Sequence, residues 1–97
     1  MTDNRMTMPF FAYIVSCADG TLYSGYTRDV ERRIATHNAG RGAAYTRGRR
    51  PVRLVHVETF QTQGDAMRRE CQLKKLSRSE KLLLIDGDTG AIEPCKP

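Results

Sequence analysis

The sequence lacks the features that mark several large classes of protein. No apolar run approaches the ~20 residues that a membrane-spanning helix needs, and residues 1–9 lack the hydrophobic segment of a secretory signal. There is no Cys/His zinc pattern, no phosphate-cradling glycine motif and no serine-nucleophile elbow. With 97 residues, the chain has room for one domain with a modest core. We therefore expect a small globular protein that makes no contact with membranes.

The cysteines and the C-terminal acids also fail to form metal sites. Cys17, Cys71 and Cys95 are an odd number without metal-ligand spacing, which is typical of reduced thiols in a cytoplasmic protein. Asp86 and Asp88 are spaced like the start of an EF-hand loop, but the other ligand positions and the closing glutamate are absent. We expect a cytoplasmic protein without a zinc or calcium site.

The positive charge is concentrated in one segment, which we expect to be a loop up to residue 50. The net charge is +5, and residues 41–53 contain five arginines and no acidic residue. Such an excess suits a polyanion, and we expect the partner to be nucleic acid. The ring at position 45 could stack on a base or pack on the protein, and both alternatives remain open. The candidate nucleic-acid-binding residues are Arg41, Tyr45, Arg47, Arg49 and Arg50.

The first third of the chain predicts a β-hairpin followed by a helix. Residues 10–17 are rich in aromatic and β-branched residues, and residues 21–26 form the returning strand. A three-residue loop with Gly20 in the left-handed conformation would pair Val15 with Tyr23. Tyr13 and Tyr23 then share one face, because side chains alternate along a strand.

The helix predicted after the hairpin separates two adjacent arginines. We expect Thr27 to cap this helix. At about 100° per residue, His37 lies beside Ile34, and Arg33 lies at the edge of the same stripe. Arg32 points to the far side, where solvent is expected. We therefore place Arg33 and His37 near the tyrosines and exclude Arg32.

The remainder predicts one more strand and two helices. Residues 51–60 read as a strand buried on both faces, in which His56 is expected to be structural. Residues 62–75 read as a helix. Ser77 and Glu80 have the spacing of a capping box that opens a last helix.

Glu70 is the anomaly of the helix over residues 62–75. It lies between Ala66 and Leu73, which define the apolar stripe. A carboxylate aimed at a core must be paired, protonated or bound to a metal, because an isolated buried charge is costly. From the residues alone, an ion pair with Arg68 or Arg69 is favoured over pairing with Arg33 or binding a divalent cation.

These elements predict an α+β fold, in which helices flank a three-stranded antiparallel sheet in the order ββαβαα. We expect the domain to span residues 8–86, with flexible termini at 1–7 and 87–97, and the protein to be a monomer.

The ordered set of tyrosines, arginine, histidine and glutamate resembles the GIY-YIG nuclease family. Phe11-Ala12-Tyr13 stands at the first triplet and Tyr23-Ser24-Gly25 at the second, and Arg33 and His37 follow on the helix. The family's metal-binding glutamate falls at Glu70. The first triplet keeps only its tyrosine, and no polar amide residue follows the glutamate at the family's position.

The resemblance implies a GIY-YIG-like fold and a metal-dependent DNA endonuclease, with a preference for structured substrates in DNA repair or processing. It implies one Mg²⁺ or Mn²⁺ held by Glu70, with the general base open between Tyr23 and His37. The alternative is a non-catalytic nucleic-acid-binding module on the same scaffold. The catalytic residues implied are Tyr13, Tyr23, Arg33, His37 and Glu70.

Overall fold

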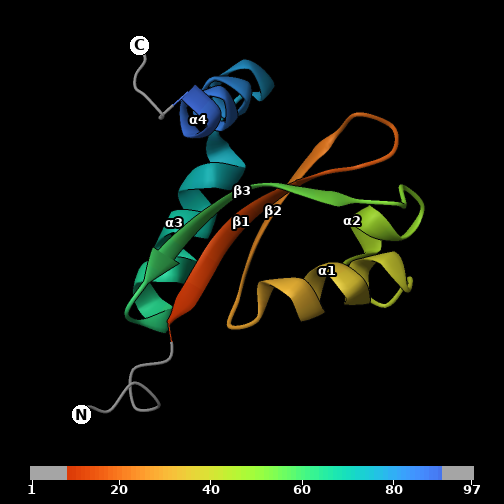
Figure 1. Cartoon of the computed structure of the whole chain (residues 1–97), viewed down its shortest axis with the longest axis horizontal. Helices are drawn as coiled ribbons and strands as arrows, with labels where there is room; N and C mark the ends of the chain where they lie inside the picture. The colour runs from red at the N-terminus through yellow and green to blue at the C-terminus, as the bar shows by residue number, and fades with distance from the viewer. Residues whose placement is uncertain (1–8, 91–97) are drawn as a thin grey trace.

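The computed structural model describes residues 9–90, which form a three-stranded sheet and four helices (Figure 1). This confirms the predicted α+β class. A short helix, α2, lies in the segment that we expected to be a loop, so the order is ββααβαα. The elements are β1 (Phe10–Ser16), β2 (Leu22–Thr27), α1 (Val30–Asn38), α2 (Ala44–Arg47), β3 (Arg53–Phe60), α3 (Gln63–Lys75) and α4 (Arg78–Gly90).

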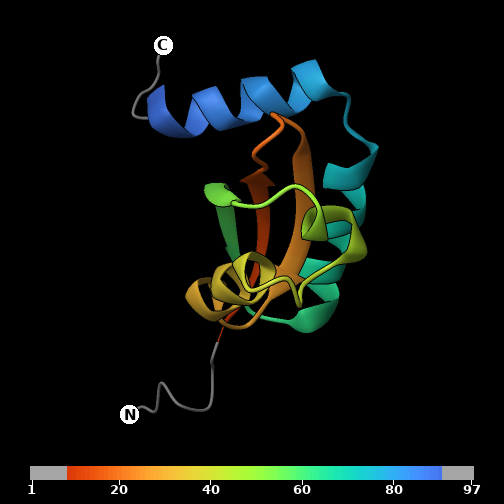
Figure 2. The same cartoon turned by 90° about the vertical axis from the view of Figure 1, so that its right-hand side faces the viewer.

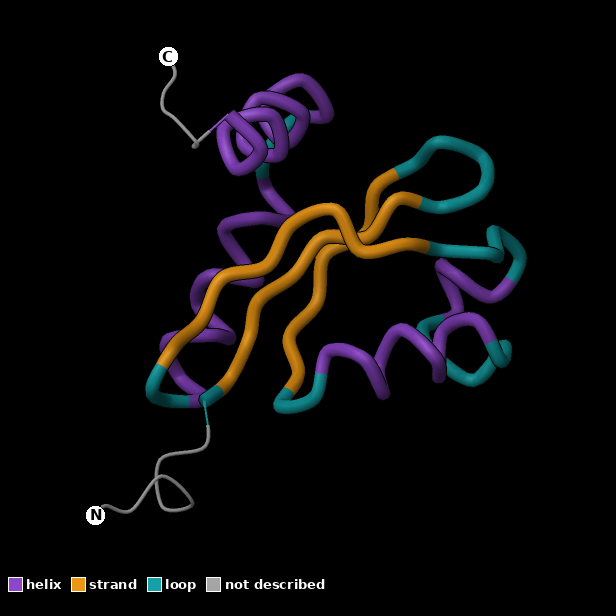
Figure 3. The backbone as a smooth tube through the Cα atoms, in the orientation of Figure 1, coloured by secondary structure: helices purple, strands orange, loops and turns teal. Residues whose placement is uncertain are grey.

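The sheet is antiparallel, and its strand order is β2-β1-β3 (Figure 3). Our expectation that the third strand is buried on both faces was wrong, because β1 takes the centre and β3 lies at an edge. Leu54 and Val57 of β3 are 39% and 40% exposed. A register shift places Leu54 opposite Val15 and His56 opposite Ile14, so one residue of β3 is extra at this point.

Each face of the sheet has its own apolar cluster. On one face, Tyr13 and Val15 pack with Cys17 and Val52, and Ile34 of α1 covers them. On the other face, Ala12 and Ile14 pack against Leu73 of α3, and apolar residues of α4 extend this cluster. Figure 2 shows α3 alongside the sheet and α4 crosswise at the strand ends. The central strand therefore contributes to both cores through its alternating side chains.

The hairpin has the predicted three-residue loop. The backbone N–H of Cys17 donates to the carbonyl of Thr21 (2.8 Å), and Gly20 adopts φ +85°. Val15 pairs with Tyr23 as expected. Glycine suits this loop because a side chain at such a φ would be strained.

The structure confirms one of the two helix caps that the sequence predicted. Our expectation that Thr27 caps α1 was wrong: the N-cap is Asp29, whose carboxylate accepts from the N–H of Arg32 (3.1 Å). The hydroxyl of Thr27 instead accepts from the N–H of Asp29 (3.2 Å) and shapes the turn before the helix. Ser77 and Glu80 form the reciprocal capping box that we predicted for α4.

The last helix, α4, continues to Gly90, past residue 86 where we expected the domain to end. The domain limits at 8 and 86 and the flexibility of the termini stay predictions, and residues 1–8 and 91–97 lie outside the described part of the chain. Across residues 9–90, no helix has the length and apolar character to span a membrane.

Ser24 offers a test of how β2 packs. Its hydroxyl is buried on the α3 side of the sheet and has no hydrogen-bond partner among the described residues. Because a buried hydroxyl without a partner destabilises the fold, Ser24→Ala should raise the free energy of unfolding by about 1 kcal/mol. Urea denaturation of both proteins measures this difference. A destabilised variant would contradict the packing described here.

Candidate active site

The hairpin places two phenols on the face that α1 covers. Tyr13 pairs with Gly25 and Tyr23 with Val15, so the two tyrosines project from the same side of the sheet. The ring of Tyr13 passes directly over Gly25: a Cβ there would lie 2.5 Å from the Tyr13 hydroxyl. Glycine at this position is therefore required for Tyr13 to reach across β2.

Helix α1 brings a histidine and an arginine to these phenols. Nε2 of the buried His37 lies 3.0 Å from the hydroxyl of Tyr13, and Nε of Arg33 donates to the same hydroxyl at 3.4 Å. The ring of Tyr23 meets the edge of the His37 ring, with centroids 5.6 Å apart. Arg32 is exposed, as the helical spacing predicted. We call Tyr13, Tyr23, Arg33 and His37 the Tyr–His cluster.

A threonine of α2 determines which nitrogen of His37 carries the proton. The hydroxyl of Thr46 donates to the carbonyl of Ala43 (3.0 Å), so its oxygen accepts from Nδ1–H of His37 (2.7 Å). Nε2 then carries the lone pair and accepts from the O–H of Tyr13. This neutral tautomer satisfies both ring nitrogens, and it makes His37 the hydrogen-bond acceptor for the phenol.

Burial shifts the pKa values of this pair. Burial raises the pKa of Tyr13 above its usual value, although Arg33 opposes the shift through its hydrogen bond and its charge. Burial lowers the pKa of His37, and the nearby charge of Arg33 lowers it further. At neutral pH both groups are therefore uncharged, consistent with a phenol that donates to a neutral imidazole.

Sequence reasoning missed Thr46 and Gly42. A Cβ at Gly42 would lie 2.2 Å from Nδ1 of His37, so glycine lets the backbone pass close to the ring. The cluster of glycines after α1 was a signal of such an approach. The contact between Thr46 and His37 gave no signal in the sequence, because it depends on how α2 folds back on α1.

Glu70 lies next to the cluster but is not a core residue. Its side chain is 18% exposed and forms an ion pair with Lys74 (3.3 Å), not with Arg68 or Arg69. Its charge acts on Tyr13, whose pKa it raises slightly. Lys74 also lies 5.7 Å from the centre of the Tyr23 ring. Through Lys74, the carboxylate is therefore linked to the edge of the cluster at Tyr23, near the protein surface.

The donor set limits the kind of metal that could bind. Among the described residues, no group of three or more histidine, cysteine and acidic side chains could hold an ion. A single carboxylate such as Glu70 suits Mg²⁺ or Mn²⁺, which prefer oxygen and keep most of their waters. Its present partner is an exposed lysine, and such pairs contribute little to stability. Glu70 therefore fits a hydrated divalent ion.

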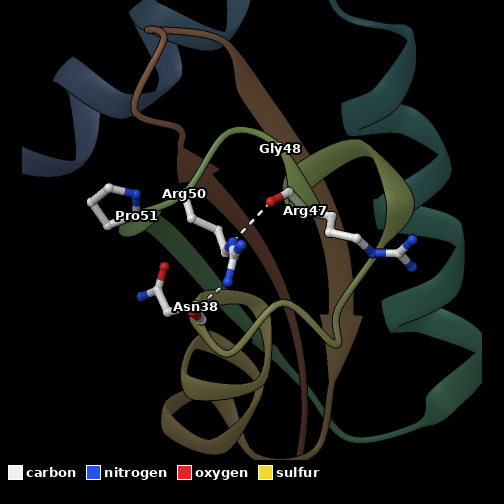
Figure 4. A pocket seen from close by; sticks show the side chains of 5 residues that line it. All are labelled: Asn38, Arg47, Gly48, Arg50 and Pro51. Atoms are coloured by element: carbon white, nitrogen blue, oxygen red, sulfur yellow. Dashed lines mark hydrogen bonds between the residues drawn. The ribbon is translucent and has the colours of Figure 1, made fainter.

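The loop arginines have internal roles that the sequence did not suggest. Arg50 donates to the carbonyls of Arg47 (2.8 Å) and Asn38 (3.4 Å), while the Arg47 side chain points away from them (Figure 4). Arg49 pairs with Asp19 of the hairpin (3.0 Å). Arg41 is exposed. Contacts between these residues and DNA stay a prediction, whereas Arg49 and Arg50 brace the loop.

Tyr45 packs against the protein, one of the two alternatives left open by the sequence. Its ring stacks on Tyr23 with centroids 5.6 Å apart, and the guanidinium of Arg49 lies 4.2 Å from the centre of the Tyr45 ring. Tyr45 is nevertheless 40% exposed. It therefore forms the outer wall of the Tyr–His cluster.

The second histidine belongs to a separate polar group on the α3 side of the sheet. Nε2 of His56 lies 2.7 Å from the carboxylate of Glu58, which also accepts two hydrogen bonds from Arg69. Burial alone would raise the pKa of Glu58, but the bonds from Arg69 and His56 lower it. The group joins β3 to α3, which suits the structural role expected for His56.

The chain matches a known family along most of its length. The family model described as the GIY-YIG catalytic domain matches residues 9–82. The chain belongs to the GIY-YIG family. This membership supports a nuclease activity on nucleic acid, and it accounts for the order of tyrosines, arginine, histidine and glutamate in the site.

Relatives of similar size share this domain. The chain is 54% identical over 85 residues to a UPF0213 protein of Natronomonas pharaonis, covering 88% of this chain and all of the relative. It is 57% identical over 76 residues to a UPF0213 protein of Staphylococcus haemolyticus, covering 78% and 93%. Their names specify no activity.

Two solved structures share the fold. The solution structure of a UPF0213 protein from Bacillus halodurans has a TM-score of 0.53 at 49% identity, covering 81% of this chain and 84% of that one. The solution structure of a protein from E. faecalis has a TM-score of 0.57 at 37% identity, covering 92% and 93%. The GIY-YIG chain described here is therefore close in size and fold to both.

The tautomer of His37 can be tested by Thr46→Val. Removing the hydroxyl leaves Nδ1–H without its acceptor, so the variant should lose about 1–2 kcal/mol of stability and show a mixture of tautomers. The ¹⁵N shifts of the imidazole measure the tautomer directly. Thr46→Ser keeps the hydroxyl and should retain the wild-type pattern. A protonated Nε2 in the wild-type protein would contradict the assignment.

The pH dependence of stability provides a second test. The folded state lowers the pKa of His37 below its ordinary value of about 6.5, so the unfolded chain binds the proton more readily. Stability from this group is full above pH ~6.5 and should fall as the pH decreases through the folded pKa. Urea unfolding from pH 7.5 to 5 should show a smaller decrease for His37→Gln than for wild type. Equal decreases would exclude His37 as the source.

Proposed function

We propose that this protein is a divalent-metal-dependent DNA endonuclease that hydrolyses phosphodiester bonds in DNA repair or processing, with a preference for structured substrates. The observation that carries the proposal is the Tyr–His cluster with the Glu70 carboxylate at its edge, because Nζ of Lys74 lies 3.3 Å from that carboxylate and 5.7 Å from the centre of the Tyr23 ring. The family supports nuclease chemistry. The described residues form one small domain, so we infer that the protein selects its DNA substrate by shape. We also propose that it acts in the cytoplasm as a monomer.

Arg33 is suited to neutralise the scissile phosphate. Its Nε is used on the Tyr13 hydroxyl, which leaves the two terminal nitrogens for non-bridging oxygens. The hydrogen bond to Tyr13 also orients the planar guanidinium. Electrostatic stabilisation of the transition state is usually the main source of rate enhancement in such reactions.

Glu70 is the residue that would hold the metal. When bound, a hydrated Mg²⁺ or Mn²⁺ would stabilise developing charge and lower the pKa of its water. Lys74 would have to leave the carboxylate, and its 49% exposed side chain has room to do so. Near Tyr23, the displaced ammonium would favour an anionic phenol or phosphate.

Two routes are available for the proton of the attacking water. The partly exposed Tyr23 could accept it as a phenolate, after releasing its own proton to solvent. Alternatively, Tyr13 could accept it while passing its own proton to Nε2 of His37 along the existing hydrogen bond, a relay that requires the 1% exposed Tyr13 to become accessible to that water. His37 is buried with both nitrogens engaged, so it would act through Tyr13 and not on water itself.

A non-catalytic DNA-binding module is the second candidate. The ion pair between Glu70 and Lys74 favours it, because it occupies the carboxylate that the metal would need. The two functions respond differently to chelation, since cleavage requires the metal and electrostatic binding does not.

A plasmid-nicking assay tests the proposal. Wild-type protein should nick supercoiled DNA in Mg²⁺ and lose this activity in EDTA. Arg33→Ala and Glu70→Gln should each lower the rate by about 10²–10³-fold, because each removes charge stabilisation in the transition state.

Two matched variants serve as controls. Arg32→Ala removes the adjacent, exposed arginine of α1, and Glu31→Gln removes an exposed carboxylate of the same helix. Both should keep wild-type activity, and circular dichroism should show that all variants are folded. Wild-type protein without activity on duplex, nicked and branched DNA would overturn the endonuclease proposal in favour of the binding module.

A further inference from the structure

A groove lies beside the Tyr–His cluster, on the outer side of Tyr45. Thr21 and Leu22 of the hairpin, Tyr45 of α2, and Arg78 and Lys81 of α4 line a volume of about 200 Å³. We call it the α4 groove. Figure 2 shows α4 at the end of the sheet. Because Tyr45 lines the groove and also stacks on Tyr23 of the cluster, its ring connects the groove to the cluster.

The α4 groove has a strongly positive lining. Among the side chains that the structure describes, no carboxylate forms an ion pair with Arg78 or Lys81. Burial lowers the pKa of Lys81, and the nearby charge of Lys74 lowers it further, so this region already crowds positive charge. A bound anion would relieve that repulsion, which makes the groove attractive to a phosphate.

The donors in the groove are held in place. One terminal nitrogen of Arg78 donates to the carbonyl of Gly20 (2.6 Å), which fixes the guanidinium against the hairpin loop. Its other N–H groups remain for a ligand, since a guanidinium has five. The groove also offers the apolar surface of Leu22 beside these donors, which suits the sugar of a nucleotide.

We propose that the α4 groove binds a backbone phosphate of the DNA strand adjacent to the phosphate at the Tyr–His cluster, through Lys81 and Arg78. This inference rests on the proposed function for its ligand and extends it to a second contact point. The contact is to the backbone and not to a stacked base, because the Tyr45 ring is already engaged by Tyr23 and Arg49. It therefore positions the strand without reading its sequence.

Binding in EDTA tests the groove apart from catalysis. Fluorescence anisotropy of a labelled duplex, measured over a range of salt, reports how many phosphates the protein contacts. Lys81→Ala should reduce the slope of log affinity against log salt by about 0.9 and weaken binding roughly tenfold at about 0.1 M salt. Lys81→Arg keeps the charge and should keep the slope.

Lys75→Ala is the matched control. Lys75 is an exposed lysine at the end of α3, beside Met67 and Cys71 and outside the α4 groove. Its removal changes the net charge by the same amount and should leave the slope unchanged. A loss that is equal for Lys81→Ala and Lys75→Ala would reflect overall charge and would overturn the groove proposal.

The outcomes separate this inference from the endonuclease proposal. Wild-type nicking together with an unchanged slope for Lys81→Ala would overturn the groove and leave the endonuclease standing. A reduced slope in a protein that does not nick would support the groove on a non-catalytic module. Wild-type protein that fails to bind DNA at any salt would overturn both.

Discussion

The hydrogen bond between the Tyr13 hydroxyl and Nε2 of His37 is the contact on which the site depends. It joins the central strand to α1 across the width of β2, and it is possible because Gly25 leaves room for the phenol. Thr46 holds the opposite side of the imidazole, so α2 takes part in the same network. A buried network of this kind is stable only when every member is satisfied, which ties the placement of three elements together.

The two faces of the sheet have different roles: one holds the larger apolar core, and the other holds the candidate site. The α3 face is an apolar core reinforced by the group of His56, Glu58 and Arg69. The α1 face carries the phenols, the arginine and the histidine over a smaller apolar cluster. Because β1 serves both faces, the core that stabilises the fold also holds Tyr13 rigidly. A site built on a central strand is positioned more precisely than one built on loops.

The basic residues fall into two kinds once the structure is known. Arg49 and Arg50 of the loop are bonded to the hairpin and to backbone carbonyls, so part of their donor capacity stabilises the protein. Lys81 and Arg78 of α4 were not candidates from the sequence, because two basic residues three positions apart on a helix resemble an ordinary solvated face. The density of positive charge along the sequence therefore did not predict every place where we propose that an anion binds.

The agreement between sequence and structure is greatest where a rule is local. The loop around Gly20, the capping box at Ser77 and the choice of Arg33 over Arg32 each depend on residues a few positions apart. The N-cap at Asp29 was missed although it is local, because Thr27 was an equally good capping residue and the turn between them decided the start of α1.

By itself, the sequence determined the α+β class, the shared face of Tyr13 and Tyr23 and the family to which the chain belongs. Strand alternation, helical periodicity and loop length decide the first two without distant contacts, and the resemblance of the ordered motif residues indicates the family. Only the tertiary structure decided that Thr46 sets the tautomer of His37, that Glu70 pairs with Lys74, and that β3 is an edge strand. These depend on which elements pack against one another, and that choice is made by the burial of surfaces far apart in the chain.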